Sequence, residues 1–230
     1  KGRPACRRKG NEMRNVIVIA GSALCLLLSS AKADNIGIPG SKHDFSGRSW
    51  MPDGQICVIC HTPHNAAAPS GAGLLWNHRQ TVAQFLPYTS ATLKAAVGQP
   101  DGSARLCLNC HDGTVMLDAF ENRAGSELCG RIIGTDLRRV HPLSFVYDDA
   151  LAVAAGHLKS PSITPSGFGG TISSDLLRGG KMQCSSCHEP HARYSNGKLL
   201  RKNDRNGTAG LCGICHTSRP PGSIDMGRWD

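Results

Sequence analysis

Large aromatic side chains are scarce in this 230-residue chain, where Phe, Trp and Tyr together make up 5% of the residues. Long branched side chains are also thinly spread between Gly, Ser, Pro and Ala. A chain of this length normally folds by burying most of its apolar surface, and these residues offer little mass for a dense core. We therefore expect something other than protein to supply part of the core.

Regular hydrophobic periodicity is also weak, and no segment predicts a convincing sheet. Moderate helical signals cover only residues 92–97 and 148–158. Stretches rich in Gly, Ser and Pro, such as residues 160–174, are typical of loops. The sequence thus predicts mostly irregular coil with short helices and little or no sheet.

One apolar run stands out, residues 16–28, and it follows a basic stretch and precedes Ala31-Lys32-Ala33. This order is typical of a secretory signal peptide, so we expect residues 1–33 to be removed by cleavage before Asp34. The alternative is an N-terminal membrane anchor, but the run is shorter than the ~20 residues that span a bilayer. We expect an exported protein, extracellular or at the cell surface or else periplasmic, with no stable membrane span.

Positive charge lies mostly in that leader. The whole chain carries a formal charge of +9, but residues 34–230 contain 19 Lys and Arg against 16 Asp and Glu. They show no cluster of basic residues interleaved with aromatics, so nucleic-acid binding has no support.

Eight of the nine cysteines after residue 33 fall into four copies of one pattern, Cys-x-x-Cys-His. In chain order, motifs 1 to 4 are Cys57-Val-Ile-Cys60-His61, Cys107-Leu-Asn-Cys110-His111, Cys184-Ser-Ser-Cys187-His188 and Cys212-Gly-Ile-Cys215-His216. On a helical turn, positions i, i+3 and i+4 share a face, so two thiols can bond the heme vinyl groups while the imidazole reaches the iron. The pattern is the attachment signature of heme c. We expect four covalent hemes, with these cysteines as their attachment points and these histidines as iron ligands.

Other uses of paired cysteines explain the pattern less well. Disulfides suit an exported chain, and zinc ribbons use Cys-x-x-Cys pairs, but neither accounts for a histidine after every second cysteine. A thioredoxin-like site needs one such pair on a strand–helix–strand unit, which the sequence does not indicate. Cys129 lies outside the motifs, and we expect a buried free thiol or, alternatively, an intermolecular disulfide.

Six further histidines exceed the four needed to make every heme iron six-coordinate: His43, His64, His78, His141, His157 and His191. Because every motif ends in His, no iron is marked as an open catalytic site, and we predict no catalytic residue. Methionine could also ligate iron and raise its potential, but Met51, Met116, Met182 and Met226 are expected to pack. Low-potential hemes with two axial histidines, in a protein that transfers electrons rather than an enzyme, are the resulting hypothesis.

An internal repeat suggests which histidines are the distal ligands. The first half, residues 34–130, and the second, residues 131–230, each hold an upstream His, a Cys-x-x-Cys-His-x-Pro-His and a plain Cys-x-x-Cys-His. The Pro should end the motif helix and project His64 or His191 towards the neighbouring heme of its own half. His43 and His141 are then left for the first heme of each half. His78 is a reserve ligand, and His157 is expected on a helix surface or packed.

This arrangement resembles the doubled Cys-x-x-Cys-His family of multiheme cytochromes over most of residues 41–217. Further matching stretches are Ser41-Lys-His-Asp, Leu75-Trp-Asn, Cys110-His-Asp-Gly-Thr-Val and His141-Pro. Four hemes in this order look like the OmcE-type tetraheme cytochromes, which polymerise into extracellular conductive filaments. The resemblance implies a compact tetraheme unit with a core of stacked hemes, a homopolymer with heme ligation between subunits, and other redox proteins as partners.

Two questions stay open at this level. His43, near the start of the processed chain, either ligates a heme of the next subunit or the motif 1 heme of its own chain. The functional alternatives to a filament subunit are a soluble periplasmic tetraheme carrier and a multiheme oxyanion reductase with one five-coordinate iron.

Overall fold

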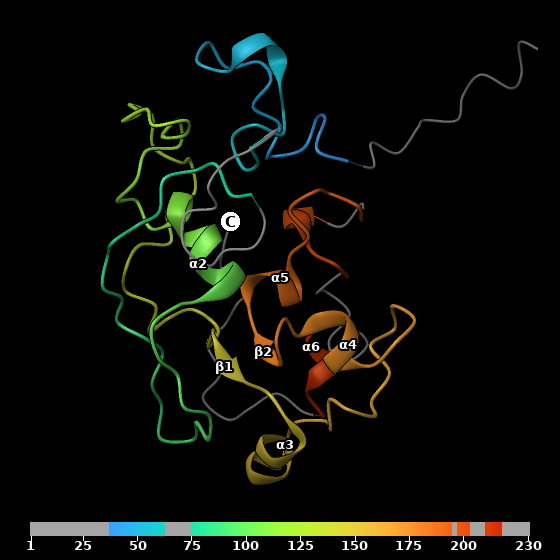
Figure 1. The fold of residues 1–230 in the computed structure, drawn as a ribbon. Helices are drawn as coiled ribbons and strands as arrows, with labels where there is room; N and C mark the ends of the chain where they lie inside the picture. The colour runs from blue at the N-terminus through green and yellow to red at the C-terminus, as the bar shows by residue number, and fades with distance from the viewer. Residues whose placement is uncertain (1–36, 63–74, 195–196, 203–209, 218–230) are drawn as a thin grey trace, which may run out of the picture. The chain divides into compact units, whose positions relative to one another are not determined.

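Turns and irregular coil make up most of the chain, and short helices are inserted into them (Figure 1). The computed structural model describes residues 37–62, 75–194, 197–202 and 210–217, all within one compact unit, Asn35–Asp230. The predicted signal peptide, residues 1–33, and His64 lie outside the described residues. No helix within these ranges is long and apolar enough to cross a membrane.

The described elements are all short. In chain order they are η1 Pro52–Gly54, α2 Gly102–His111, β1 Phe145–Val146, α3 Asp149–Ala155, α4 Ile172–Leu176, β2 Lys181–Met182, α5 Cys184–Cys187, η2 Gly197–Leu199 and α6 Cys212–Cys215. The two strands pair antiparallel, with Phe145 opposite Met182 and Val146 opposite Lys181. The prediction of coil with short helices and little sheet is therefore confirmed for the described residues.

Helix α3 forms where the sequence predicted one. The side chain of Asp148 accepts a hydrogen bond of 2.8 Å from the Leu151 amide and so caps the first turn. Gly156 ends the helix in a left-handed conformation (φ 71°), which glycine adopts without steric penalty.

Two expectations about local structure are wrong. Residues 92–97 form no helix. They lie in a segment of turn, bend and coil in which Leu93, Ala95 and Val97 alternate with exposed neighbours, and Ala95 and Val97 pack on the core. Six residues are also too few to be helical without strong tertiary support. Conversely, α4 begins inside the predicted loop of residues 160–174, since Thr171 and Ser174 cap it reciprocally and it buries Ile172.

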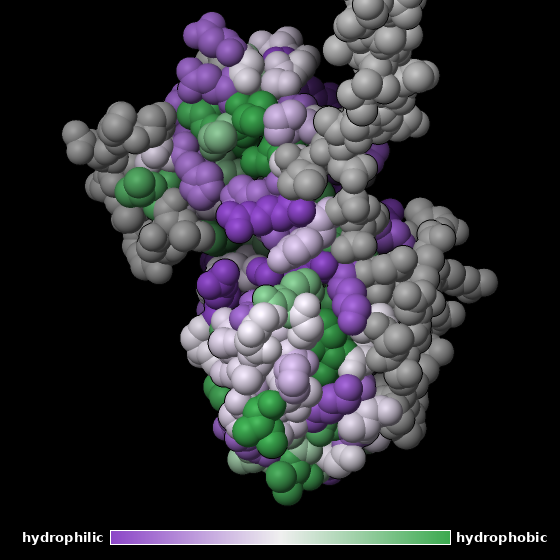
Figure 2. Space-filling model, turned by 90° about the vertical axis from the view of Figure 1, so that its right-hand side faces the viewer, coloured by the Kyte–Doolittle hydropathy of each residue, from purple (hydrophilic) through white to green (hydrophobic). Residues whose placement is uncertain are grey.

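The protein core is divided into small clusters. One cluster draws on residues 45–120, including Met51 and Phe120, and a second draws mainly on residues 145–215, including Met182 and Ile172. A third, around Phe85, is smaller. On the face shown in Figure 2, apolar residues likewise occur in separate groups with hydrophilic residues between them. Protein side chains alone thus form several modest cores, as the scarcity of large side chains predicted.

Candidate heme-binding sites

Each Cys-x-x-Cys-His motif is wound into a single helical turn. In motifs 1, 3 and 4 the histidine amide donates to the carbonyl of the first cysteine, at 2.9, 2.9 and 3.0 Å. Motif 2 forms the last turns of α2, which ends at His111. The predicted helices are confirmed for motifs 2, 3 and 4, while motif 1 is a hydrogen-bonded turn. Positions i, i+3 and i+4 of a helical turn lie on one side, which is the arrangement that heme attachment requires.

The cysteines of these motifs form no disulfides. All nine described cysteines are free, and none of these residues is completely buried, although burial raises the pKa of several of their thiols. Cysteines that serve only for packing are among the most completely buried residues in proteins. Free cysteines in pairs on helical turns fit residues that bond to a large group beside them.

The four motifs are neighbours in the order of the sequence. Burial and the nearby Cys107 thiol raise the pKa of Cys60 to about 11, which places motif 1 beside motif 2. The Cys107 and Cys184 thiols interact, which lowers the pKa of Cys107 and raises that of Cys184, so motif 2 lies beside motif 3. Burial and the nearby Cys212 raise the pKa of Cys187 to about 11, which places motif 3 beside motif 4. The attachment points therefore form a continuous series.

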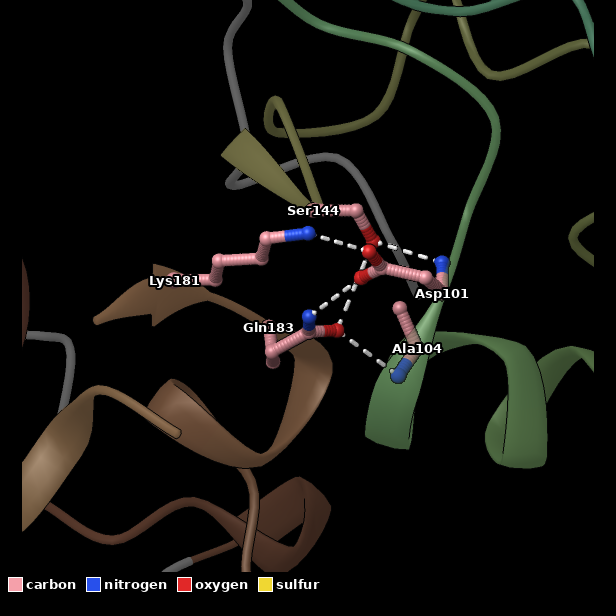
Figure 3. A network of polar contacts seen from close by, with 5 residues as sticks. All are labelled: Asp101, Ala104, Ser144, Lys181 and Gln183. Atoms are coloured by element: carbon pink, nitrogen blue, oxygen red, sulfur yellow. Dashed lines mark hydrogen bonds and ion pairs between the residues drawn. The ribbon is translucent and has the colours of Figure 1, made fainter. Parts of the chain in front are cut away.

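A buried polar network holds motif 2 against motif 3, as Figure 3 shows. The Gln183 amide donates to Asp101 at 2.9 Å, and its carbonyl oxygen accepts 2.9 Å from the Ala104 amide at the start of α2. Asp101 also pairs with Lys181, and its amide donates to the Ser144 hydroxyl at 3.0 Å. Because Gln183 directly precedes Cys184, this network fixes where α5 meets α2.

Most of the candidate ligand histidines are oriented through one ring nitrogen. In each, Nδ1 lies near an oxygen acceptor, which leaves Nε2 as the nitrogen that can bind a metal. The acceptors are Arg131 O for His111 (2.7 Å), Lys198 O for His188 (2.9 Å), Pro190 O for His43 (3.3 Å), Pro142 O for His141 (2.9 Å) and Glu189 Oε1 for His191 (2.8 Å).

Three histidine pairs have the separation expected of two axial ligands on one iron. An imidazole nitrogen binds a transition metal at about 2 Å and lies about 1.2 Å from its ring centroid, so two trans imidazoles have centroids about 6.4 Å apart. The observed centroid distances are 6.3 Å for His43 and His111, 6.3 Å for His61 and His191, and 6.4 Å for His141 and His216. The candidate ligands therefore fit heme iron in both ligand type and spacing.

These pairs differ from those that the order of the repeat predicted. His43 lies beside motif 2 rather than motif 1, and His141 lies beside motif 4 rather than motif 3. His191, expected near motif 4, lies beside His61 of motif 1. Motif order along the chain contains no information on which turn faces which, and so could not reveal this arrangement.

His157 also approaches His216, with ring centroids 5.5 Å apart. Its neighbour Leu158 pairs with His216 in an antiparallel bridge, and the Thr217 amide donates to the His157 carbonyl at 2.9 Å. This centroid distance is shorter than the about 6.4 Å expected of two imidazoles on one iron, so His157 packs beside His216.

The reserve ligand His78 is 2% exposed, and backbone oxygens lie close to both of its ring nitrogens. Nδ1 is 3.0 Å from Arg79 O, and Nε2 is 3.1 Å from Leu117 O. The latter nitrogen also lies 3.4 Å from the Cys110 thiol. A ring held in this way is suited to packing beneath motif 2.

Cys129 makes a contact that the sequence did not reveal. Its sulfur lies 3.4 Å from His111 Nδ1, and this hydrogen bond is the main reason that the pKa of His111 is raised to about 9. The side chain is partly exposed rather than buried as expected. The proximal histidine of motif 2 thus has two acceptors, a thiol and the Arg131 carbonyl.

Residues 177–220 match the family of the doubled CXXCH motif. The matched segment contains motifs 3 and 4. It supports a multiheme c-type cytochrome, in which CXXCH motifs bind heme covalently and the hemes transfer electrons. No curated protein matches the chain.

Proposed function

We propose that the protein transfers electrons through four covalently bound hemes, each with two axial histidines, as a subunit of an extracellular filament that conducts electrons to external acceptors. It is not an enzyme in this proposal. Its partners are other copies of itself and other redox proteins, after export and removal of residues 1–33.

The observation that supports electron transfer most directly is the succession of the four motifs. Thiols of motifs 1 and 2, 2 and 3, and 3 and 4 lie close enough to affect one another's pKa. Bound heme c supplies a reversible one-electron change at iron, and the protein sets its spacing, ligation and burial. Attachment points in an unbroken series are suited to passing electrons from one heme to the next.

The histidines support a carrier over an enzyme. Three of the four motif histidines have a second imidazole at the axial spacing. An iron with two imidazoles has no free position for substrate, whereas a reductase needs one. Failure of the reduced protein to bind carbon monoxide is the expected result, and stoichiometric binding by one heme would favour the reductase.

Heme stoichiometry tests the proposal. The processed protein should have an intact mass with four hemes that survive denaturation and acid extraction, and one reactive thiol, that of Cys129. A Cys184→Ala/Cys187→Ala variant should have three hemes. Three or fewer hemes in correctly matured wild-type protein would refute it.

The proposal of a filament subunit rests on the resemblance of the whole motif set to filament-forming cytochromes. The position of His43, in contrast, favours the alternative of a soluble periplasmic carrier. His43 lies against its own chain, 6.3 Å from the His111 ring and 3.3 Å from Pro190 O. Negative-stain microscopy of purified protein separates the two: filaments support the proposal, and uniform single particles support the carrier.

Removing residues 34–46 should abolish filaments and leave one iron short of a ligand if His43 acts between subunits. The same deletion should open one iron without affecting assembly if it acts within the chain.

A further inference from the structure

We propose that the two halves of the chain are joined by a shared heme: His191, from the second half, is the distal ligand of the iron held by motif 1 in the first half. The inference rests on the proposed heme ligation and adds which half supplies the ligand. It replaces the pairing within each half that the repeat predicts.

The spacing of the two rings is the primary observation. The centroids of His61 and His191 are 6.3 Å apart and the ring planes are inclined by 11°. The separation equals that of two imidazoles on opposite faces of one heme, about 6.4 Å. His191 follows the motif 3 histidine by only three residues, and the intervening Pro190 turns the chain away from the motif 3 helix.

The His191 ring is held in place by a buried carboxylate. Glu189 is 7% exposed, and its Oε1 lies 2.8 Å from His191 Nδ1 and accepts from the His191 amide at 3.3 Å. Its other oxygen accepts from the Arg193 amide at 2.8 Å. A carboxylate that binds Nδ1 fixes the tautomer in which Nε2 has a lone pair for the metal. His191 is therefore oriented as a ligand, and motif 1 is the motif that it faces.

The loop that bears His191 also contacts the first half at two other points. The Pro190 carbonyl lies 3.3 Å from His43 Nδ1, and the Ala192 carbonyl accepts 3.1 Å from the Gly37 amide. Ala192 itself is buried and adopts a left-handed conformation (φ 54°) that closes the turn. These contacts seat the loop on first-half residues independently of any heme.

The remaining pairs leave no competing role for His191 at motif 4. The imidazole neighbours of His216 are His141 and His157. His141 occupies the axial spacing there, at 6.4 Å, as His43 does for motif 2 at 6.3 Å. In both halves the upstream histidine thus faces the last motif, which leaves His191 free to serve motif 1.

A set of double variants of the full, heme-loaded protein tests the assignment. An affected heme is one that is lost or becomes high-spin, counted by electron paramagnetic resonance, carbon monoxide binding and intact mass. His191→Ala should give one affected heme, and His61→Ala should also give one. If both histidines serve one iron, His61→Ala/His191→Ala should still give one. The matched control, His216→Ala/His191→Ala, should give two.

The opposite pattern, two affected hemes with His61→Ala and one with His216→Ala, would overturn the shared heme while leaving ligation by histidine pairs intact. So would two affected hemes in both double variants, which would place His191 on another iron. Fewer than four low-spin hemes in the unaltered protein would instead refute the proposed function. His191→Met, which retains a ligand, covers poor folding of the alanine variants: its single raised potential should vanish with His61→Ala and persist with His216→Ala.

Discussion

A histidine can bind a metal only through a ring nitrogen that has no other partner, and this separates His78 from the other histidines. Backbone oxygens lie near both of its nitrogens, and the ring is fully buried. The described candidate ligands are at least partly exposed. Five of them have only Nδ1 near an acceptor: His43, His111, His141, His188 and His191. Burial and hydrogen bonding thus separate His78 from these histidines where sequence spacing cannot, whereas His157, with Nδ1 2.8 Å from Ala155 O, differs from them in its spacing to His216.

Replacing His78 by Ala should therefore destabilise the protein without opening an iron. Loss of the buried ring leaves a backbone oxygen without its donor, which costs about 1–3 kcal/mol. Chemical denaturation should show this loss, and electron paramagnetic resonance should show four low-spin hemes. His157→Ala, at a more exposed ring, is the control and should cost less. One high-spin heme in His78→Ala would instead make His78 a ligand.

The sequence predicted the chemistry of individual residues better than their partners. The Cys-x-x-Cys-His spacing is local and follows from one helical turn, so the sites of attachment could be predicted from it. The partner of His191 is 130 residues away in the chain, and the repeat favoured the nearest motif instead. Likewise, the contact of Cys129 with His111 depends on how a loop of irregular structure returns to α2.

At the scale of elements, the junction of α2 and α5 is fixed by polar groups rather than by apolar packing. Gln183 is 2% exposed and contacts both the Asp101 carboxylate and the first turn of α2. The hydroxyls of Ser103 and Ser185 add a contact of 2.6 Å across the same junction. Such a network is stable only when every polar group in it has a hydrogen-bond partner. A single substitution should therefore disturb both α2 and α5.

Gln183→Ala should lower the free energy of unfolding by about 1–3 kcal/mol, because the buried Ala104 amide loses its acceptor. It should also change the magnetic coupling between the hemes of motifs 2 and 3, measured by electron paramagnetic resonance. Gln183→Glu restores the acceptor but brings a second carboxylate to Asp101. Its stability should therefore be lower than wild type at pH 7 and approach it in acid. Unchanged stability and coupling in both variants would show that the network does not position α5.

The same junction gives an acid dependence with a definite sign. Burial raises the pKa of Asp101, but hydrogen bonds from Lys181 and Gln183 outweigh it, so the net shift is downward. A carboxylate whose pKa is lowered by folding stabilises the protein above its ordinary pKa of about 4, and this contribution is lost as the pH falls through the folded value. The junction is therefore expected to hold at neutral pH and to weaken in strong acid.

Elements show why local signals were insufficient. Residues 148–158 contain both a cap and a terminating glycine, and α3 formed as predicted. Residues 92–97 lack such ends, and they form an irregular segment in which every second residue packs inward. The helix α4 was not predicted because the residues that cap it, Thr171 and Ser174, are also typical of loops.

At the scale of the molecule, one contact lies between cysteines of different motifs. The thiols of Cys107 in motif 2 and Cys184 in motif 3 lie close enough to shift each other's pKa, and neither cysteine is in a disulfide. Thiols this close are oxidised readily to a disulfide once one of them is attacked or activated. The two cysteines belong to different hemes, so such a bond would block both attachments.

Heme-free protein that folds in an oxidising compartment should therefore acquire a Cys107–Cys184 disulfide. Peptide mapping by mass spectrometry, after trapping of free thiols, should detect it in protein exported without heme and not in the loaded protein. Cys184→Ala/Cys187→Ala provides the control, in which the cross-linked peptide must disappear. Finding only bonds within motifs would contradict the expectation.

That contact also bears on the order of events in biogenesis. If the chain folded before its hemes were attached, the Cys107 and Cys184 thiols would already lie close together where α2 meets α5. Attachment would then have to precede folding of this junction, because a thioether at either cysteine would leave no pair of thiols to oxidise. Heme attachment would thus protect the chain from a wrong disulfide, and motif 2 would need its heme before motif 3 packs beside it.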